Sequence, residues 1–128
     1  MELLRRDFIA GSTAVAALAG TAQAGAPANA AMYGLIGRMM ARPGQRGALA
    51  EILLDGVSDM PGCLSYIVAE DGENADALWI TEVWESREAH AASLSLPAVR
   101  AAIARARPLI AGMDNGHSTR PIGGHGLK

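Results

Sequence analysis

The chain has 128 residues, of which 50% are apolar and 19% are charged, and its formal net charge is −2. This composition is typical of a globular domain and excludes the basic surface of a nucleic-acid-binding protein. The length predicts one domain with a modest core, and domains of this size often gain stability by self-association. Because Cys63 is the one cysteine, no intrachain disulfide can form, and no Cys/His cluster has the spacing of a metal site.

Residues 1–24 resemble a twin-arginine export signal. Arg5 and Arg6 precede a weakly apolar run at 13–20, which is too short for stable membrane insertion because a spanning helix needs about 20 apolar residues. Small residues at 22–24 then fit a cleavage site, and a second candidate site ends at Ala30. We therefore predict a signal peptide at 1–24, a linker at 25–30 and a folded domain at 31–128. The mature protein would be periplasmic or secreted.

Hydrophobic periodicity predicts alternating strands and helices in the rest of the chain. The predicted strands occupy 32–42, 63–69, 77–85 and 113–122. The predicted helices occupy 48–60, 87–94 and a segment that begins at Pro97. Ser86 would cap the short helix that follows it. Turn-forming residues at 71–74 separate the second and third strands, which predicts an antiparallel hairpin.

This order of elements is typical of a split βαβ, ferredoxin-like α+β fold with its helices on one face of the sheet. Trp79 and Trp84 lie an odd number of residues apart, so they would face opposite sides of their strand. The first strand also carries apolar residues on both faces. The uncovered sheet face would then be apolar, and a second copy of the sheet would cover it. The sequence predicts a homodimer with a sheet-on-sheet, barrel-like interface.

Several short segments of the sequence together match the pattern of a known protein family. They are YGLIG at 33–37, RPG at 42–44, MPGCLSY at 60–66, WITEVWES with EAH at 79–90, and PIGG at 121–124. These segments resemble the antibiotic biosynthesis monooxygenase family, in its small quinol-monooxygenase branch, and the resemblance covers about residues 31–127. It implies a dimeric α+β barrel. It also implies an enzyme that oxidises quinols or polyketide-like aromatics with O2 and needs no metal or flavin, although some relatives degrade haem.

Oxygenation without a cofactor makes definite demands on a protein. The substrate must supply the electrons, so it first loses a proton to a base inside a dry pocket. His90 is the predicted catalytic base, because the ordinary pKa of histidine, about 6.5, lies near working pH. The alternative is a histidine that serves helix packing. Trp84 would stack on an aromatic substrate, or else pack in the core or the dimer interface.

Three further side chains are candidates for substrate binding. The hydroxyl groups of Tyr66 and Tyr33 would bond a substrate oxygen, or find partners within the fold. Arg38 is a charge within an apolar strand. It would bind an anionic substrate or, as the favoured alternative, pair with Glu82 or Glu70.

These observations predict an exported, homodimeric, cofactor-independent monooxygenase that acts on a small quinol or related aromatic with O2. Two other functions stay open. One is a non-catalytic dimer that binds hydrophobic aromatic ligands. The other is a haem-binding or haem-degrading relative, for which His90 would be the ligand.

Overall fold

The computed structural model describes residues 31–127. The predicted signal peptide at 1–24 and the linker at 25–30 lie outside these residues, as does residue 128 of the predicted domain. Within the described part of the chain, no helix is long and apolar enough to cross a membrane.

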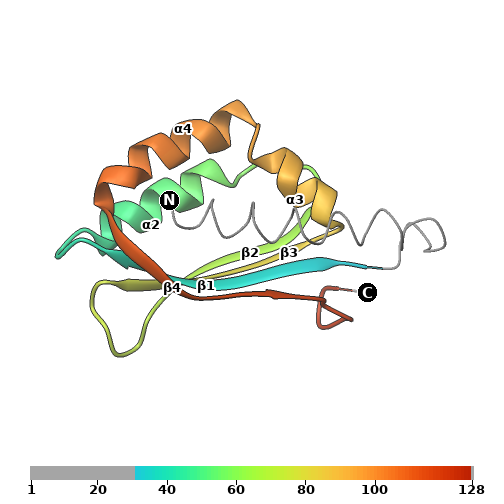
Figure 1. Ribbon diagram of the computed structural model, residues 1–128, viewed down its shortest axis with the longest axis horizontal. Coiled ribbons are helices and arrows are strands. Elements are labelled where there is room, and N and C mark those ends of the chain that lie inside the picture. Colours follow the sequence, from blue (N-terminus) through green and yellow to red (C-terminus); the bar gives the residue numbers. More distant parts are fainter. Residues whose placement is uncertain (1–30, 128) are drawn as a thin grey trace.

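Four antiparallel strands form one sheet, and the helices of the described chain lie on one of its faces (Figure 1). The strands are β1 (Tyr33–Ala41), β2 (Cys63–Glu70), β3 (Ala77–Trp84) and β4 (Ile110–Thr119). The helices are α2 (Arg46–Gly56), α3 (Arg87–Ser93), α4 (Pro97–Ala106) and the 3-10 turn η1 (Arg107–Leu109). With the strand order β2-β3-β1-β4, this is the ferredoxin-like α+β fold that the sequence predicted.

Local sequence signals set the ends of several elements. The Ser86 hydroxyl accepts a hydrogen bond from the Ala89 backbone N–H at 3.0 Å, so it caps α3 as predicted. In the turn between β2 and β3, Asp71 Oδ1 accepts hydrogen bonds from the backbone N–H groups of Glu73 (2.8 Å) and Asn74 (3.0 Å). The predicted hairpin of the second and third strands is confirmed.

The core lies between the sheet and the helices. Its main buried cluster consists of Met39, Ala41, Leu49, Leu53, Leu78, Ile80, Ala106 and Ile110. A smaller cluster beneath α3 consists of Tyr33, Leu35 and Trp84. Helix α2 ends at Gly56, earlier than predicted. A Cβ at Gly56 would lie 2.6 Å from the Ala102 Cβ, so the glycine allows α2 to approach α4 closely.

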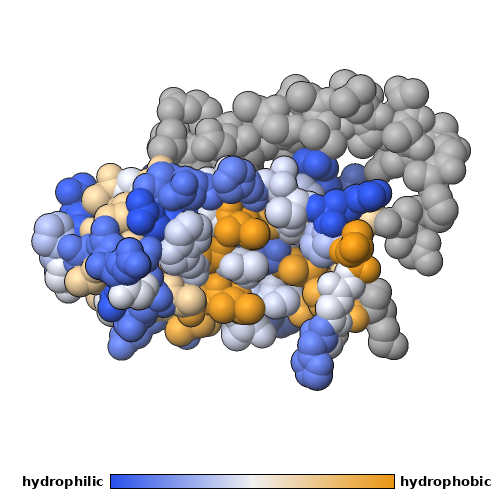
Figure 2. Space-filling view, turned by 90° about the horizontal axis from the view of Figure 1, so that it is seen from below, coloured by the Kyte–Doolittle hydropathy of each residue, from blue (hydrophilic) through white to orange (hydrophobic). Residues whose placement is uncertain are grey.

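The other face of the sheet carries apolar side chains that no described helix covers. The register places Ile67, Thr81 and Ile36 in one row across β2, β3 and β1. Ile67 is 52% exposed and Ile36 is 37% exposed, and Figure 2, viewed from below the sheet of Figure 1, shows hydrophobic residues gathered near the centre of this face. Trp84 is buried on the helix side, while Trp79 lies on the open face beside Arg38. The predicted opposite orientation of the two tryptophans is confirmed.

Candidate functional site

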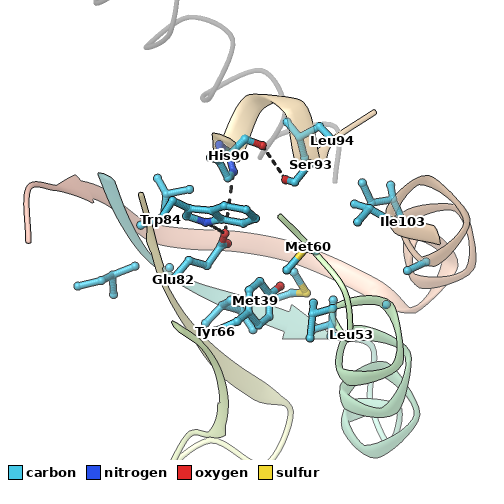
Figure 3. A pocket seen from close by; sticks show the side chains of 18 of the residues that line it. Met39, Leu53, Met60, Tyr66, Glu82, Trp84, His90, Ser93, Leu94 and Ile103 are labelled. Carbon is cyan, nitrogen blue, oxygen red and sulfur yellow. Dashed lines mark hydrogen bonds and ion pairs between the residues drawn. The ribbon is translucent and has the colours of Figure 1, made fainter. Parts of the chain in front are cut away.

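A cavity of about 130 Å³ lies between the sheet and the helices (Figure 3). Its apolar lining includes Met39, Leu53, Met60, Leu94 and Ile103. Its polar side chains are those of Tyr66, Glu82, His90 and Ser93. Apolar cavities of roughly this size accept a single aromatic ring. The site is therefore a mostly apolar pocket with a few convergent polar groups, as small-molecule sites usually are.

Glu82 is the buried carboxyl group of the cavity. Alternation along β3 places its side chain on the same face as Ile80 and Trp84, and the side chain is 13% exposed. Its Oε1 accepts a hydrogen bond from Trp84 Nε1 at 2.9 Å. Burial raises the pKa of Glu82 to about 7, although the Trp84 hydrogen bond acts to lower it. Near neutral pH this carboxyl group is thus able to take up or release a proton.

His90 lies on α3 with its ring held among aromatic side chains. Its Nε2 lies 3.9 Å from Glu82 Oε1, and its ring centroid lies 5.4 Å from that of Trp84 and 5.5 Å from that of Tyr33. Burial lowers the pKa of His90 to about 4, and the charge of Arg87 acts in the same direction. At pH 7 the imidazole is therefore neutral.

Tyr66 and Ser93 complete the polar part of the cavity wall. Burial raises the pKa of the Tyr66 hydroxyl, and the negative charge of Glu82 raises it further. Tyr66 is consequently a neutral hydrogen-bond donor throughout the physiological range. The Ser93 hydroxyl donates to the His90 backbone carbonyl at 2.6 Å, which ties it to the same helix turn.

The structure brings four of the predicted site residues together, but Tyr33 is not part of the cavity wall. His90, Trp84 and Tyr66 line the cavity directly. Tyr33 contacts the ring of His90, and the Arg87 guanidinium lies 4.5 Å from the Tyr33 ring centroid. Tyr33 can therefore influence the cavity through the position of His90.

Arg38 lies on the open face of the sheet, away from the cavity. It donates two hydrogen bonds to the carboxylate of Asp114, at 2.9 and 2.7 Å, and lies 3.7 Å from Asp71. The expected pairing with Glu82 or Glu70 is wrong. Glu82 projects from the opposite face of the sheet, and Glu70 instead pairs with Arg46 at 3.3 Å. The structure thus gives Arg38 a role in joining β1 to β4.

Sequence reasoning missed Glu82 as a member of the site. The available signal was its position, because it is a charged residue at the same alternation parity as Leu78, Ile80 and Trp84. Within residues 31–127, no group of three or more His, Cys, Asp or Glu side chains is placed to hold a metal ion. The arrangement that is present, a carboxyl group beside an imidazole and an indole in an apolar cavity, can accept a proton from a molecule bound there.

Comparison with known proteins gives a consistent result. A family model described as antibiotic biosynthesis monooxygenase matches residues 32–105. A crystal structure from Chloroflexus aurantiacus J-10-fl, described as a candidate antibiotic biosynthesis monooxygenase, is 64% identical, with a TM-score of 0.74. That match covers 76% of this chain and 99% of the other. No curated protein matches this chain.

More distant structures share the fold. One from Caulobacter crescentus CB15, with the same kind of description, is 20% identical with a TM-score of 0.66, and the match covers 72% of this chain and 91% of the other. One from Mycobacterium tuberculosis is 24% identical with a TM-score of 0.62, and the match covers 71% and 95% of the two chains. At these identities the likeness concerns the fold alone.

Proposed function

Because this chain belongs to the antibiotic biosynthesis monooxygenase family, we propose that it oxidises a small quinol or related aromatic with O2 and needs no metal or flavin. One observation supports the proposal above the others. The apolar cavity contains a titratable pair, Glu82 and His90, beside the aromatic wall formed by Trp84. These are the parts that a cofactor-free oxygenation requires.

The chemistry begins with loss of a hydroxyl proton from the quinol. The resulting anion is electron-rich and supplies the four electrons that reduce O2. One oxygen atom forms a bond to a ring carbon, and the other leaves as water, so that a quinol and O2 give a hydroxylated quinone and one water molecule. The protein must hold the anion, accept the proton and keep bulk water out.

Four of the residues that line the cavity have a part in this scheme. The Glu82–His90 pair accepts the proton. Trp84 provides a flat apolar surface for an aromatic ring. The Tyr66 hydroxyl is a neutral donor for a substrate oxygen, and hydrogen bonds to a developing negative charge are strong in an environment of low polarity.

Removal of both proton acceptors tests this function. In Glu82→Gln/His90→Ala, O2 uptake with hydroquinones, naphthoquinols or anthrone-like phenols should fall by about 10²- to 10⁴-fold, the usual contribution of general base catalysis. Uptake by the chelator-treated wild type should persist. His117→Ala is the matched control, because His117 is exposed on β4 outside the cavity, and circular dichroism checks the fold of each variant. Wild-type uptake no faster than autoxidation for every substrate would reject the monooxygenase and favour the ligand-binding alternative.

We also propose that the protein is a homodimer built on the open face of the sheet. The support is the two exposed apolar side chains Ile36 and Ile67, which lie in one row on either side of Thr81, since exposed apolar surface commonly marks an interface. Ile67→Asp should therefore yield a monomer in light scattering at micromolar concentration. Leu54→Asp, at a similarly exposed position (53%) on α2, should leave the dimer intact. A wild type of monomeric mass would refute this assembly.

Export to the periplasm or the medium is a further part of the proposal. It rests on Arg5, Arg6 and the small residues at 22–24 of the sequence. N-terminal sequencing of the protein recovered from the periplasm decides between cleavage after Ala24 and after Ala30, and recovery of an uncleaved chain from the cytoplasm alone would contradict export.

A further inference from the structure

We propose that Glu82, rather than His90, takes the proton from the substrate, and that the cavity selects uncharged, hydroxyl-bearing aromatics over anionic ones. This inference rests on the proposed function and assigns one of its steps. In that step the substrate O–H bond breaks, its electron pair stays on the substrate oxygen, and the proton forms a bond to a carboxylate oxygen of Glu82.

The geometry of the carboxyl group supports this assignment. Oε1 of Glu82 is occupied by the Trp84 hydrogen bond and faces His90 Nε2 (Figure 3). Oε2 accepts no hydrogen bond within the part of the chain that the structure describes. In that same part, no polar side-chain atom is both fully buried and without a hydrogen-bond partner. Oε2 is therefore reachable from the cavity, where it can receive a proton.

His90 is placed to position Glu82. Its Nε2 faces Glu82 Oε1, and its ring is packed between Trp84 and Tyr33. The Trp84 indole binds Oε1 through a hydrogen bond, and the His90 ring lies beside the same oxygen, so Oε2 is the carboxylate oxygen left for a substrate proton. We assign His90 the role of a positioning residue.

Charge conservation explains the preference for uncharged substrates. When ionised Glu82 takes a proton from a neutral phenol, one negative charge moves from the carboxylate to the substrate, and no additional charge forms in the apolar cavity. A neutral imidazole acting as the base would create two opposite charges there, which is costly where water is excluded. The described residues that line the cavity include no Lys or Arg. An anionic substrate would thus meet ionised Glu82 without a compensating cation in the wall.

Among the described titratable groups around the cavity whose pKa values are shifted, Glu82 is the one whose pKa lies near 7. Burial raises the pKa values of Cys63 and Tyr66 on β2 and of Tyr33 on β1, so these groups stay neutral. The pKa of His90 on α3 is lowered to about 4. On β4, the carboxylate of Asp114 is ion-paired with Arg38, which holds its pKa below the usual range. The lining residues from α2 and α4 are apolar.

The first test is the pH dependence of kcat/KM for O2 uptake with a neutral quinol between pH 5 and 8.5. The wild-type rate should rise through about pH 7, because ionised Glu82 is the active form. Glu82→Gln should lose this rise and at least 10²-fold of the rate, whereas His90→Asn should keep the rise. Trp84→Phe should move it to higher pH, because it removes the hydrogen bond that lowers the pKa of Glu82. A rate that is flat over this range in the wild type and lost in His90→Asn would identify His90 as the base instead.

The second test does not depend on turnover, so it separates this inference from the proposed function. In a Trp79→Phe background, quenching of the Trp84 fluorescence at pH 8 reports binding of 4-methylphenol, which is uncharged, and of benzoate, an anion of similar size. Benzoate should bind at least tenfold more weakly than 4-methylphenol, and Glu82→Gln should reduce this difference. Equal binding of both probes to the chain that keeps Glu82 would overturn the substrate preference, whether or not the protein consumes O2.

Discussion

Replacing Gly37 with leucine is expected to abolish aromatic binding and O2 uptake while the protein stays folded. Gly37 lies on β1 and lines the cavity. Among the described residues, the one heavy atom within 4 Å of an added Cβ, apart from the chain neighbours, is the Gly116 Cα at 3.9 Å, so the leucine side chain would enter empty space. Glycine weakens a strand, and the replacement therefore need not destabilise the sheet. The change should act by occupying the space that the substrate needs.

The measurements are the dissociation constant for 4-methylphenol, the rate of O2 uptake and the melting temperature. We expect binding to weaken by more than tenfold and uptake to fall in parallel, with a melting temperature equal to or above that of the wild type. Gly47→Leu is the matched control, because Gly47 is an exposed glycine on α2, and an added Cβ there would approach no other described part of the fold within 4 Å. If Gly37→Leu binds 4-methylphenol as tightly as the wild type does, the ligand site lies elsewhere.

The second large effect is expected on stability, from Gly62→Ala in the turn immediately before β2. Gly62 has a φ of +84°, and an added Cβ would lie 2.6 Å from the Ala89 Cβ on α3. The left-handed backbone costs a non-glycine residue about 1–2 kcal/mol, and overpacking costs typically about 1–3 kcal/mol. We expect the free energy of unfolding to fall by about 2–5 kcal/mol, because the two costs add.

Gly44→Ala separates the two costs. Gly44 has a φ of +78°, close to that of Gly62, but within residues 31–127 no non-neighbouring atom lies within 4 Å of an added Cβ. Only the backbone cost of about 1–2 kcal/mol should appear in this variant. Urea unfolding at one fixed protein concentration measures both, since the stability of the proposed dimer would depend on concentration. Equal losses in the two variants would mean that the contact with α3 contributes nothing.

The Gly62 contact also links the fold to the site. Ala89 precedes His90 on α3, so an alanine at position 62 would push away the helix that holds His90 above Glu82. Activity in Gly62→Ala should accordingly fall at temperatures where the protein remains folded. The glycine is therefore part of what sets the position of the histidine in the cavity wall.

Features controlled by neighbours in the chain were readable from the sequence. The Ser86 cap and the turn at Asp71 involve hydrogen bonds to backbone groups two or three residues away. The opposite orientation of Trp79 and Trp84 follows from strand alternation alone. The order of the predicted strands and helices then indicated the ferredoxin-like fold. The sequence also proposed His90, Trp84 and Tyr66 as site residues, and all three line the cavity.

Contacts between distant segments were decided only by the tertiary structure. Arg38 pairs with Asp114, 76 positions away, because β1 and β4 are neighbours in the sheet, and no local pattern indicates which carboxylate it meets. The importance of Glu82 depends on burial, which exists only once α3 and β2 pack over and beside β3. Burial removes water from the carboxyl group and raises its pKa to about 7. The sequence by itself determined the elements and the residues available for chemistry, and the packing of those elements determined which of the residues can exchange a proton near neutral pH.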